Sequence, residues 1–176
     1  MEWLINTVLI LYLFWVFHLN RRAVSGPLVG IGIYRDCATT MLTTAIDMPG
    51  PVIEKALTAK HIPSTVDDIR QSWRKMLSCM HSVNVYANNY TRKDVSGYVL
   101  ARAYTGSMWV NAKRWPSEST PNKIRIVLHE CSHLALSTED YYYMGHANFT
   151  HLRGTQARNN ADTVTLLIMD INNYTC

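Results

Sequence analysis

A run of 17 residues without a charged side chain, from Trp3 to Leu19, restricts the fold of this chain more than any other feature. Its length is at the short end of what a helix needs to span a bilayer. Trp15 lies near its end and Arg21 and Arg22 follow it directly, and such residues are common where a membrane helix meets the headgroups. We therefore expect residues 1–22 to form an N-terminal membrane segment.

Two other interpretations of this run remain open. A cleaved signal peptide is one, since Ala23-Val24-Ser25 resembles a small-x-small cleavage site, although only Met1 and Glu2 stand where a positive region is expected. A buried core helix is the other. If the run is a membrane segment, the two arginines after it favour a cytoplasmic body; if it is cleaved, the protein is secreted.

The overall composition describes one ordinary domain beyond that run. The chain has 176 residues, of which 48% are hydrophobic and 17% charged, so a disordered tail is excluded. Four cysteines are too few for a disulfide-dense miniprotein, although their even number permits disulfides. A net charge of +4, with no run of Lys or Arg longer than two, gives no support for nucleic acid as a partner.

The pattern of apolar residues and turn residues predicts an α+β fold. Residues 23–33, rich in glycine, read as a linker to a domain at 34–176. Ser64 and Asp67 have the spacing of a capping box and predict that a helix begins there. The remaining expected elements are two helical pieces in Tyr34–Ala59 broken at Met48–Pro51, strands in Val83–Val110, a helix over Lys123–Leu136, and helices in Tyr141–Tyr174 with a break near Gly154.

The chemistry is concentrated in residues 129–133, which read His-Glu-Cys-Ser-His, an HExxH motif. On a helix, positions i and i+4 lie on one face, so His129 and His133 can point at one ion. Two neutral imidazoles suit zinc. Glu130, one step round the helix, can reach a water molecule on that ion. The alternative is a buried helix that happens to carry two histidines.

A catalytic zinc usually has a third protein ligand, and the residues after the motif limit the choice. The metzincin pattern would need glycine at 136 and histidine at 139, where this chain has Leu136 and Glu139. The thermolysin-like arrangement needs a later glutamate, and none follows Glu139. The acids and histidines that remain are Glu139, Asp140, His146, His151, Asp162 and Asp170.

Two further motifs resemble those of a known family. Thr138-Glu139-Asp140-Tyr141-Tyr142-Tyr143 matches T-x-D-x-x-Y, and Asn160-Ala161-Asp162 matches a later N-A-D element. Together with HExxH, in this order, they resemble the aspzincins, the family of deuterolysin and peptidyl-Lys metalloendopeptidase. The resemblance covers roughly residues 86–162. It implies a zincin-like α+β metalloprotease domain with a small sheet and an HExxH active-site helix, preceded here by the membrane segment.

The resemblance also implies roles for particular residues. His129, His133 and Asp140 would bind Zn²⁺, and Glu130 would be the general base. Tyr143 would donate its hydroxyl to the oxyanion, and the strand-like stretch 97–115 would contain the substrate-binding edge strand, around residues 106–111. Asp162 would line the S1′ pocket and favour a basic P1′ residue. Thr165 stands where lysine-specific members carry an acid, which argues against strict lysine specificity.

Each of these roles has an alternative. Ser137, in place of the motif's glycine, could turn the chain so that Asp140 reaches the ion, or Ser137 and Asp140 could form a capping box for a helix that begins at Tyr141. Tyr143 could pack as an ordinary aromatic residue. Asp162 could instead be the zinc ligand or a structural acid.

The sequence thus predicts a membrane-tethered zinc metalloendopeptidase that acts on protein or peptide substrates. Two alternatives have the same motifs. One is a catalytically inactive, membrane-tethered binding protein that keeps the zincin fold. The other is a secreted protease toxin or effector. The sequence does not predict the oligomeric state.

Overall fold

The computed structural model describes residues 31–88, 93–94, 97–98, 101–104 and 106–175. The membrane segment expected at 1–22 and most of the linker lie outside these residues, and no helix among the described ones is long and apolar enough to cross a membrane. The helices are α2 (Ile31–Asp47), α3 (Gly50–Ala59), α4 (Val66–Ser82), α5 (Thr120–Leu136), α6 (Gly154–Asn159) and α7 (Ala161–Ile171). The strands are β1 (Asn84–Asn88), β2 (Lys93–Asp94), β3 (Gly97–Tyr98), β4 (Ala101–Tyr104) and β5 (Ser107–Asn111), and two short 3-10 turns cover Trp115–Ser117 and Phe149–His151.

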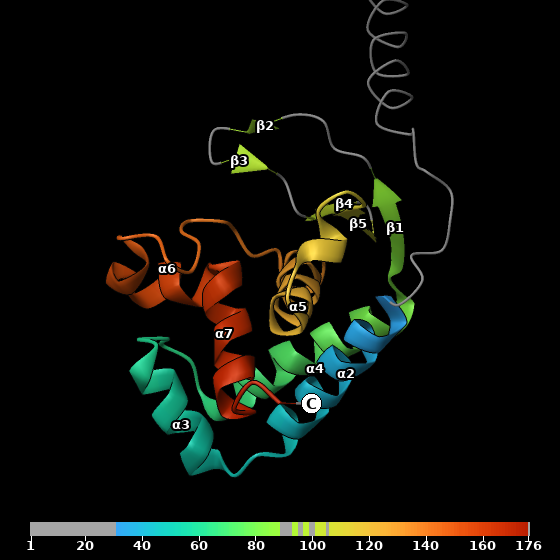
Figure 1. Ribbon diagram of the computed structural model, residues 1–176. Helices are drawn as coiled ribbons and strands as arrows, with labels where there is room; N and C mark the ends of the chain where they lie inside the picture. The colour runs from blue at the N-terminus through green and yellow to red at the C-terminus, as the bar shows by residue number, and fades with distance from the viewer. Residues whose placement is uncertain (1–30, 89–92, 95–96, 99–100, 105, 176) are drawn as a thin grey trace, which may run out of the picture.

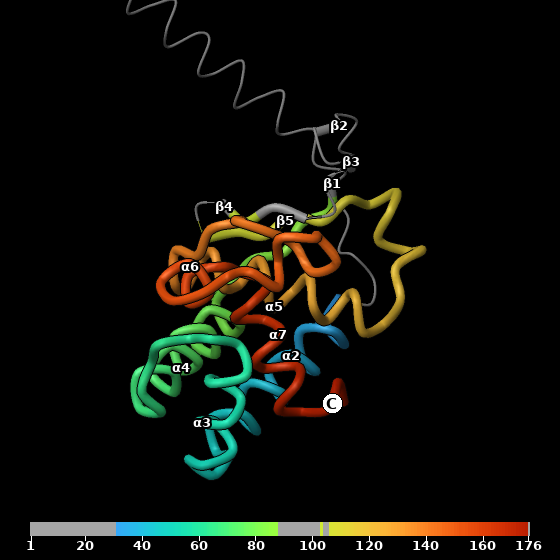
Figure 2. The backbone as a smooth tube through the Cα atoms, turned by 90° about the vertical axis from the view of Figure 1, so that its left-hand side faces the viewer, coloured from blue at the N-terminus to red at the C-terminus, as the bar shows by residue number. Residues whose placement is uncertain are grey.

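Helix α5 lies in the middle of the molecule. A small sheet covers one side of it, and α2, α4 and α7 pack on the other (Figure 1). The view at right angles shows the same order, with the sheet and the segment that precedes α6 above α5 and the helices below it (Figure 2). The expected α+β architecture is confirmed at this level.

The main sheet has three strands in the order β1-β5-β4. Strand β5 pairs in parallel with β1, residue Asn84 opposite Ser107, and antiparallel with β4, residue Ala101 opposite Val110. Both edges of β5 are therefore occupied. The expectation that residues 106–111 form an edge strand is wrong, because among the described strands of this sheet β4 and β1 are at the edges. Figure 1 places β4 next to α5.

The N-terminal helices follow the sequence pattern closely. Helices α2 and α3 are separated at Met48 and Pro49, and Pro51 lies in the first turn of α3, where a missing N–H costs nothing. Helix α4 buries Ile69, Trp73, Met76 and Met80, which recur at the expected spacing of three or four residues. The predicted break at Met48–Pro51 is confirmed.

The region Tyr141–Tyr174 departs from expectation in its first third. Residues 141–148 contain no helix, and only α6 and α7 are helical beyond the short turn at Phe149–His151. The reason is that a side chain satisfies the backbone instead: the N–H groups of Tyr141 and Tyr142 donate to Asn160 Oδ1, at 3.0 and 3.1 Å. The break near Gly154 is confirmed, since α6 begins there with φ +57°.

The described cysteines differ in their chemical state. Cys37, on α2, is disulfide-bonded, whereas Cys79 and Cys131 are free thiols. Cys131 lies inside the HExxH motif, is fully buried, and donates its thiol to the Met76 carbonyl of α4 at 3.3 Å. It therefore helps to fix α5 against α4, in keeping with the expectation that it is a small buried residue.

The cap of α4 gives a direct test of local structure. Thr65, not Ser64, is the N-cap, because its side chain accepts a hydrogen bond from the Asp68 N–H at 3.1 Å. Thr65→Ala should lower the free energy of unfolding by about 1 kcal/mol, since an N–H at the helix start loses its partner. The measurement is urea unfolding followed by circular dichroism.

The matched control is Ser64→Ala, which removes the hydroxyl that the sequence pattern favours as the cap. Its effect should be within about 0.5 kcal/mol, as for an ordinary surface substitution. A larger loss for Ser64→Ala than for Thr65→Ala would contradict the cap seen here.

Candidate metal centre

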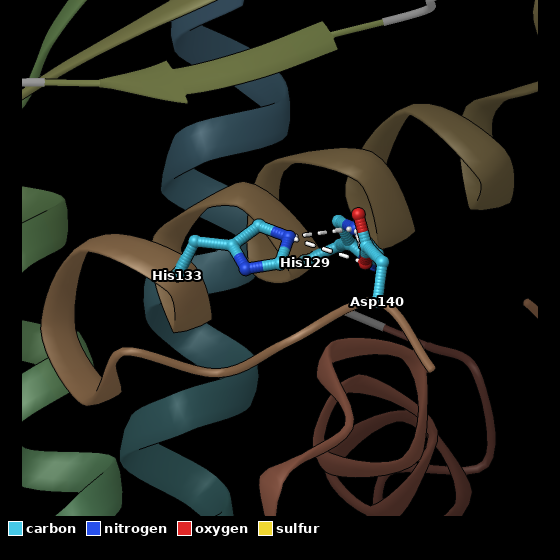
Figure 3. Close-up of side chains that lie close together, drawn as sticks. All are labelled: His129, His133 and Asp140. Atoms are coloured by element: carbon cyan, nitrogen blue, oxygen red, sulfur yellow. Dashed lines mark hydrogen bonds and ion pairs between the residues drawn. The ribbon is translucent and has the colours of Figure 1, made fainter. Parts of the chain in front are cut away.

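The two histidines of HExxH are held on the central helix. Helix α5 begins after Ser119, whose hydroxyl accepts from the Asn122 N–H at 3.4 Å, and Pro121 lies in its first turn. His129 and Glu130 are buried, each 6% exposed, and His133 is half-buried. Because His129 and His133 are one turn apart, their rings come together on one face of α5 (Figure 3).

A left-handed residue returns the chain from α5 to this face. Ser137 is the C-cap, with φ 55° and ψ 41°, and its N–H donates to the His133 carbonyl at 3.1 Å. Three residues later Asp140 points back at the two rings (Figure 3). Ser137 thus makes the turn expected of it. The alternative, a capping box for a helix at Tyr141, is wrong because no helix begins there.

Three atoms converge on one point. His129 Nε2 lies 3.2 Å from His133 Nε2, and Asp140 Oδ1 lies 3.1 Å from the first and 3.3 Å from the second. Among the residues that the structure describes, these three form the group of histidines and acids close enough to hold a metal ion. Ligands at about 2.1 Å from a tetrahedral zinc are separated by roughly 3.4 Å. The observed separations are close to this value.

The contacts of the two Nδ1 atoms determine where the proton of each histidine ring lies. His129 Nδ1 contacts Asp162 Oδ1 at 2.7 Å, and His133 Nδ1 contacts the Thr138 carbonyl at 2.7 Å. Both partners are acceptors, so each Nδ1 carries the proton and each Nε2 of a neutral ring presents a lone pair. Two lone pairs and a carboxylate oxygen therefore meet with no donor among them, which is an environment that requires a cation.

The titration of these groups follows from their contacts. Burial acts to lower the pKa of His129, but hydrogen bonds to Asp140 and Asp162 outweigh it and raise the pKa to about 9. Burial acts to raise the pKa of Asp140, but hydrogen bonds from the two histidines hold it well below its usual range. In the absence of metal, one histidine thus takes up a proton and supplies the missing positive charge.

Glu130 and Tyr143 lie beside the three converging atoms. Burial raises the pKa of the Glu130 carboxyl, against the lowering effect of positive charge at the histidines. The Tyr143 hydroxyl donates to Asp140 Oδ2 at 2.9 Å. The ring of Tyr143 stacks on the ring of His129, with the centroids 6.0 Å apart. Burial and the charge of Asp140 raise the pKa of Tyr143, so its hydroxyl keeps its proton.

The remaining candidates for a third ligand lie elsewhere. Asp170 is at the far end of α7 and pairs with Lys60 at 2.5 Å. His146 is exposed and stacks on Tyr142, with centroids 5.1 Å apart. Asp162 contacts the other nitrogen of His129, not the point where the ligand atoms meet. Of the acids and histidines that the sequence left open, the geometry selects Asp140.

Three further residues support the segments around the converging atoms, although the sequence analysis assigned none of them a role: Asn160, Thr138 and Arg125. Asn160 Nδ2 donates to the Tyr142 carbonyl at 3.1 Å, in addition to the two bonds that its oxygen accepts. The Thr138 hydroxyl contacts that of Ser132 at 2.8 Å. Arg125 precedes His129 by four residues, so the i,i+4 rule places both on one face, a signal that could have linked them.

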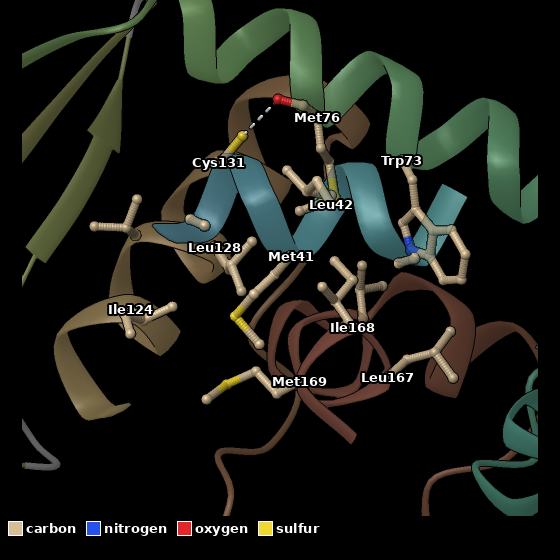
Figure 4. Packing of buried hydrophobic residues seen from close by; sticks show 14 of the residues in the cluster. Met41, Leu42, Trp73, Met76, Ile124, Leu128, Cys131, Leu167, Ile168 and Met169 are labelled. Carbon is tan, nitrogen blue, oxygen red and sulfur yellow. Dashed lines mark hydrogen bonds between the residues drawn. The ribbon is translucent and has the colours of Figure 1, made fainter. Parts of the chain in front are cut away.

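The opposite side of α5 fixes the helix in the core. Leu128 and Cys131 pack against Leu42 of α2 and Met76 of α4, and all four are fully buried (Figure 4). Ile168 of α7 belongs to the same cluster. The histidines therefore project from a helix that can neither rotate nor shift without disturbing three neighbours, which fixes the position of the two candidate ligands.

Comparison with protein-family models finds no match for this chain, and comparison with curated proteins finds none either. The resemblance to the aspzincins therefore rests on the motif residues themselves. The structure brings His129, Glu130, His133, Asp140 and Tyr143 to one place, and Asp162 contacts His129 on the side of the ring away from that place.

Metal-free protein should become less stable as the pH rises. The pKa of His129 is raised from 6.5 to about 9, so its stabilising contribution is complete below pH 6.5 and is lost as the pH passes about 9. The loss from this group is about 3 kcal/mol. Urea unfolding between pH 6 and 9.5 in the presence of a chelator measures it.

His129→Asn is the control for this pH dependence, because it removes the contribution of His129 and should make the slope smaller. A slope remains from His133, since burial acts to lower its pKa but its hydrogen bonds with Asp140 and the Thr138 backbone outweigh burial and raise it. An identical slope in the variant and in the wild-type protein would contradict the assignment to His129.

Ser137→Gly should raise the free energy of unfolding by about 1 kcal/mol, because Ser137 adopts φ 55°, where a Cβ is strained and glycine is not. Ser137→Ala keeps the Cβ and serves as the control, with an effect within about 0.5 kcal/mol. Thermal unfolding of the three proteins side by side distinguishes them. A stabilisation shared by alanine and glycine would show that the backbone strain is absent.

Proposed function

We propose that this protein is a zinc-dependent metalloendopeptidase. The observation that carries the proposal is the convergence of His129 Nε2, His133 Nε2 and Asp140 Oδ1 within 3.3 Å of one another, beside the buried acid Glu130. Two imidazoles and one carboxylate are a donor set typical of catalytic zinc, which keeps a fourth position open. The side chain of Asp140 is 35% exposed, which leaves one side of the site accessible.

The chain's own groups support peptide hydrolysis. Zinc, when bound, would lower the pKa of a water molecule to about 7 and polarise the substrate carbonyl. Glu130 would take the proton of the attacking water and pass it to the leaving amine, a task that the raised pKa of Glu130 suits. Tyr143 would turn its hydroxyl from Asp140 to the developing oxyanion, an interaction worth roughly 3 kcal/mol.

Strand β4 is the part of the sheet best placed to bind an extended peptide. It is an edge strand among the described strands, it packs over α5, and the Ala103 backbone forms a hydrogen bond with Glu130. A peptide that adds to this edge by main-chain hydrogen bonds would bring its carbonyl group near the general base. We propose further that residues 1–22 tether this domain to a membrane.

The test uses the full chain, purified in detergent, loaded with zinc and offered casein and a peptide library. The wild-type protein should bind one zinc ion and cleave internal peptide bonds. Glu130→Gln should retain the zinc but lower kcat/KM at least about 100-fold, because the general base is lost. Zinc content is measured by atomic absorption and cut sites by mass spectrometry.

Glu139→Gln is the matched control, since Glu139 is an exposed acid one residue from a proposed ligand, and the bonds that join it to Asn159 and Ala161 are made by its backbone. It should cleave as well as wild type. Cleavage that survives Glu130→Gln, or a wild-type protein with neither zinc nor activity, would refute the proposal. Zinc binding without cleavage would instead favour the inactive binding protein.

A further inference from the structure

We infer that Asp162 is a positioning residue for the metal ligand His129 and for the segment that carries Tyr143, and that it does not select basic side chains of the substrate. The inference rests on the proposed metal site. It departs from the role in the S1′ pocket that the family resemblance implies for the aspartate of the N-A-D element.

The carboxylate of Asp162 is enclosed and fully engaged. Its side chain is 1% exposed. Oδ1 accepts from Arg125 Nη1 at 2.6 Å and contacts His129 Nδ1 at 2.7 Å, and Oδ2 accepts from the Met144 N–H at 2.6 Å. Both oxygens are therefore occupied by protein groups.

The contact with His129 determines how that ring presents itself to a metal ion. Because the carboxylate accepts from Nδ1, it holds the tautomer in which Nε2 is free to bind, and it prevents rotation of the ring. Carboxylates that act on histidine ligands in this way typically strengthen metal binding 10- to 100-fold. Asp162 lies on α7 and His129 on α5, so the ring is also fixed between two helices of the core.

The contact with Met144 extends the same support to the next part of the site. Residues 141–148 form no helix, and the backbone bond within them that closes a turn runs from the His146 N–H to the Tyr143 carbonyl at 3.0 Å. Asn160 holds the backbone of Tyr141 and Tyr142, and Asp162 holds that of Met144, so Tyr143 is fixed on both sides. Asn160 and Asp162 of the N-A-D element thus fix the backbone on either side of Tyr143 and so position its hydroxyl.

The same contacts argue against electrostatic selection of the substrate. The guanidinium of Arg125 already balances the charge of Asp162, and no oxygen of the carboxylate faces solvent. A lysine or arginine side chain of a substrate could reach Asp162 only by displacing Arg125 from a buried ion pair, which is costly. Cleavage should therefore show no preference for basic P1′ residues that depends on Asp162.

The experiment compares four variants of the full chain: Asp162→Asn, Arg125→Met, the double variant, and Asp170→Asn. The double variant avoids an unpaired buried arginine, and its comparison with Arg125→Met reports the contacts of Asp162 with His129 and Met144 without that of Arg125. Asp170→Asn removes another carboxylate from the same helix, outside the site. Zinc affinity is measured by competition with a chromogenic chelator, and cleavage on peptides that differ only in Lys or Leu at P1′.

We expect the double variant to bind zinc 10- to 100-fold more weakly than Arg125→Met, and Asp170→Asn to bind it like wild type. At saturating zinc, the ratio of kcat/KM between the Lys and Leu peptides should be the same in all variants. Unchanged zinc affinity, or a loss of cleavage confined to the Lys peptide, would overturn the inference.

The outcome separates this inference from the proposed function. If wild type binds zinc but cleaves neither peptide, the peptidase proposal fails while the affinity comparison still decides the role of Asp162. If wild type cleaves and the affinities are equal, the positioning role fails and the peptidase stands. Absence of any zinc binding by wild type refutes both.

Discussion

Burial of α5 is the constraint on which the rest of the structure depends. The helix has to present two imidazoles to one point, and it does so with the sheet on one side and three helices on the other. Leu128 and Cys131 point into the core while His129 and His133 point toward Asp140. An exposed helix could carry the same motif, but its ligands would have to be ordered at the cost of their own rotamer entropy. In this protein the ligands are already ordered, because folding of the core fixes α5.

The position of Asp140, the candidate third ligand, is fixed in a different way. Asp140 follows a left-handed turn and belongs to a segment without regular structure, so no helix or strand holds its backbone. The junction of α6 and α7 holds its neighbour Glu139, which forms an isolated parallel bridge with Asn160. The Glu139 N–H donates to the Asn159 carbonyl at 2.7 Å, and the Ala161 N–H donates to the Glu139 carbonyl at 2.9 Å. The geometry of the candidate metal centre is therefore a property of α5 and of the junction of α6 and α7 together. A displacement of α7 would move Asp140 and Tyr143, and it would also separate Asp162 from the ring of His129.

The parts of this structure that could be predicted from sequence are those decided by neighbours in the chain. The i,i+4 spacing of His129 and His133, the proline break before α3 and the turn at Ser137 are of this kind. The failures involve contacts between distant residues. Tyr141 and Tyr142 tolerate a helix, and only the Asn160 side chain, 18 or 19 residues later, makes the irregular path satisfactory. Likewise, alternation of apolar residues identifies β5 as a strand but cannot show that it lies between β1 and β4, since β1 joins it in parallel from a distance.

The charges around the site explain why a chain so poor in acids places several of them together. Asp140, Glu130 and Asp162 contribute three carboxylates, and Arg125 is the one guanidinium that pairs with this group in the described residues. Two negative charges are left without a partner, in a region where an unpaired charge is expensive. The metal-free protein reduces this imbalance by raising the pKa of His129 to about 9, so that the ring takes up a proton. A divalent cation would neutralise the group completely and would release that proton. Metal binding and histidine protonation are then two ways to satisfy the same electrostatic demand, and they exclude one another at His129 Nε2.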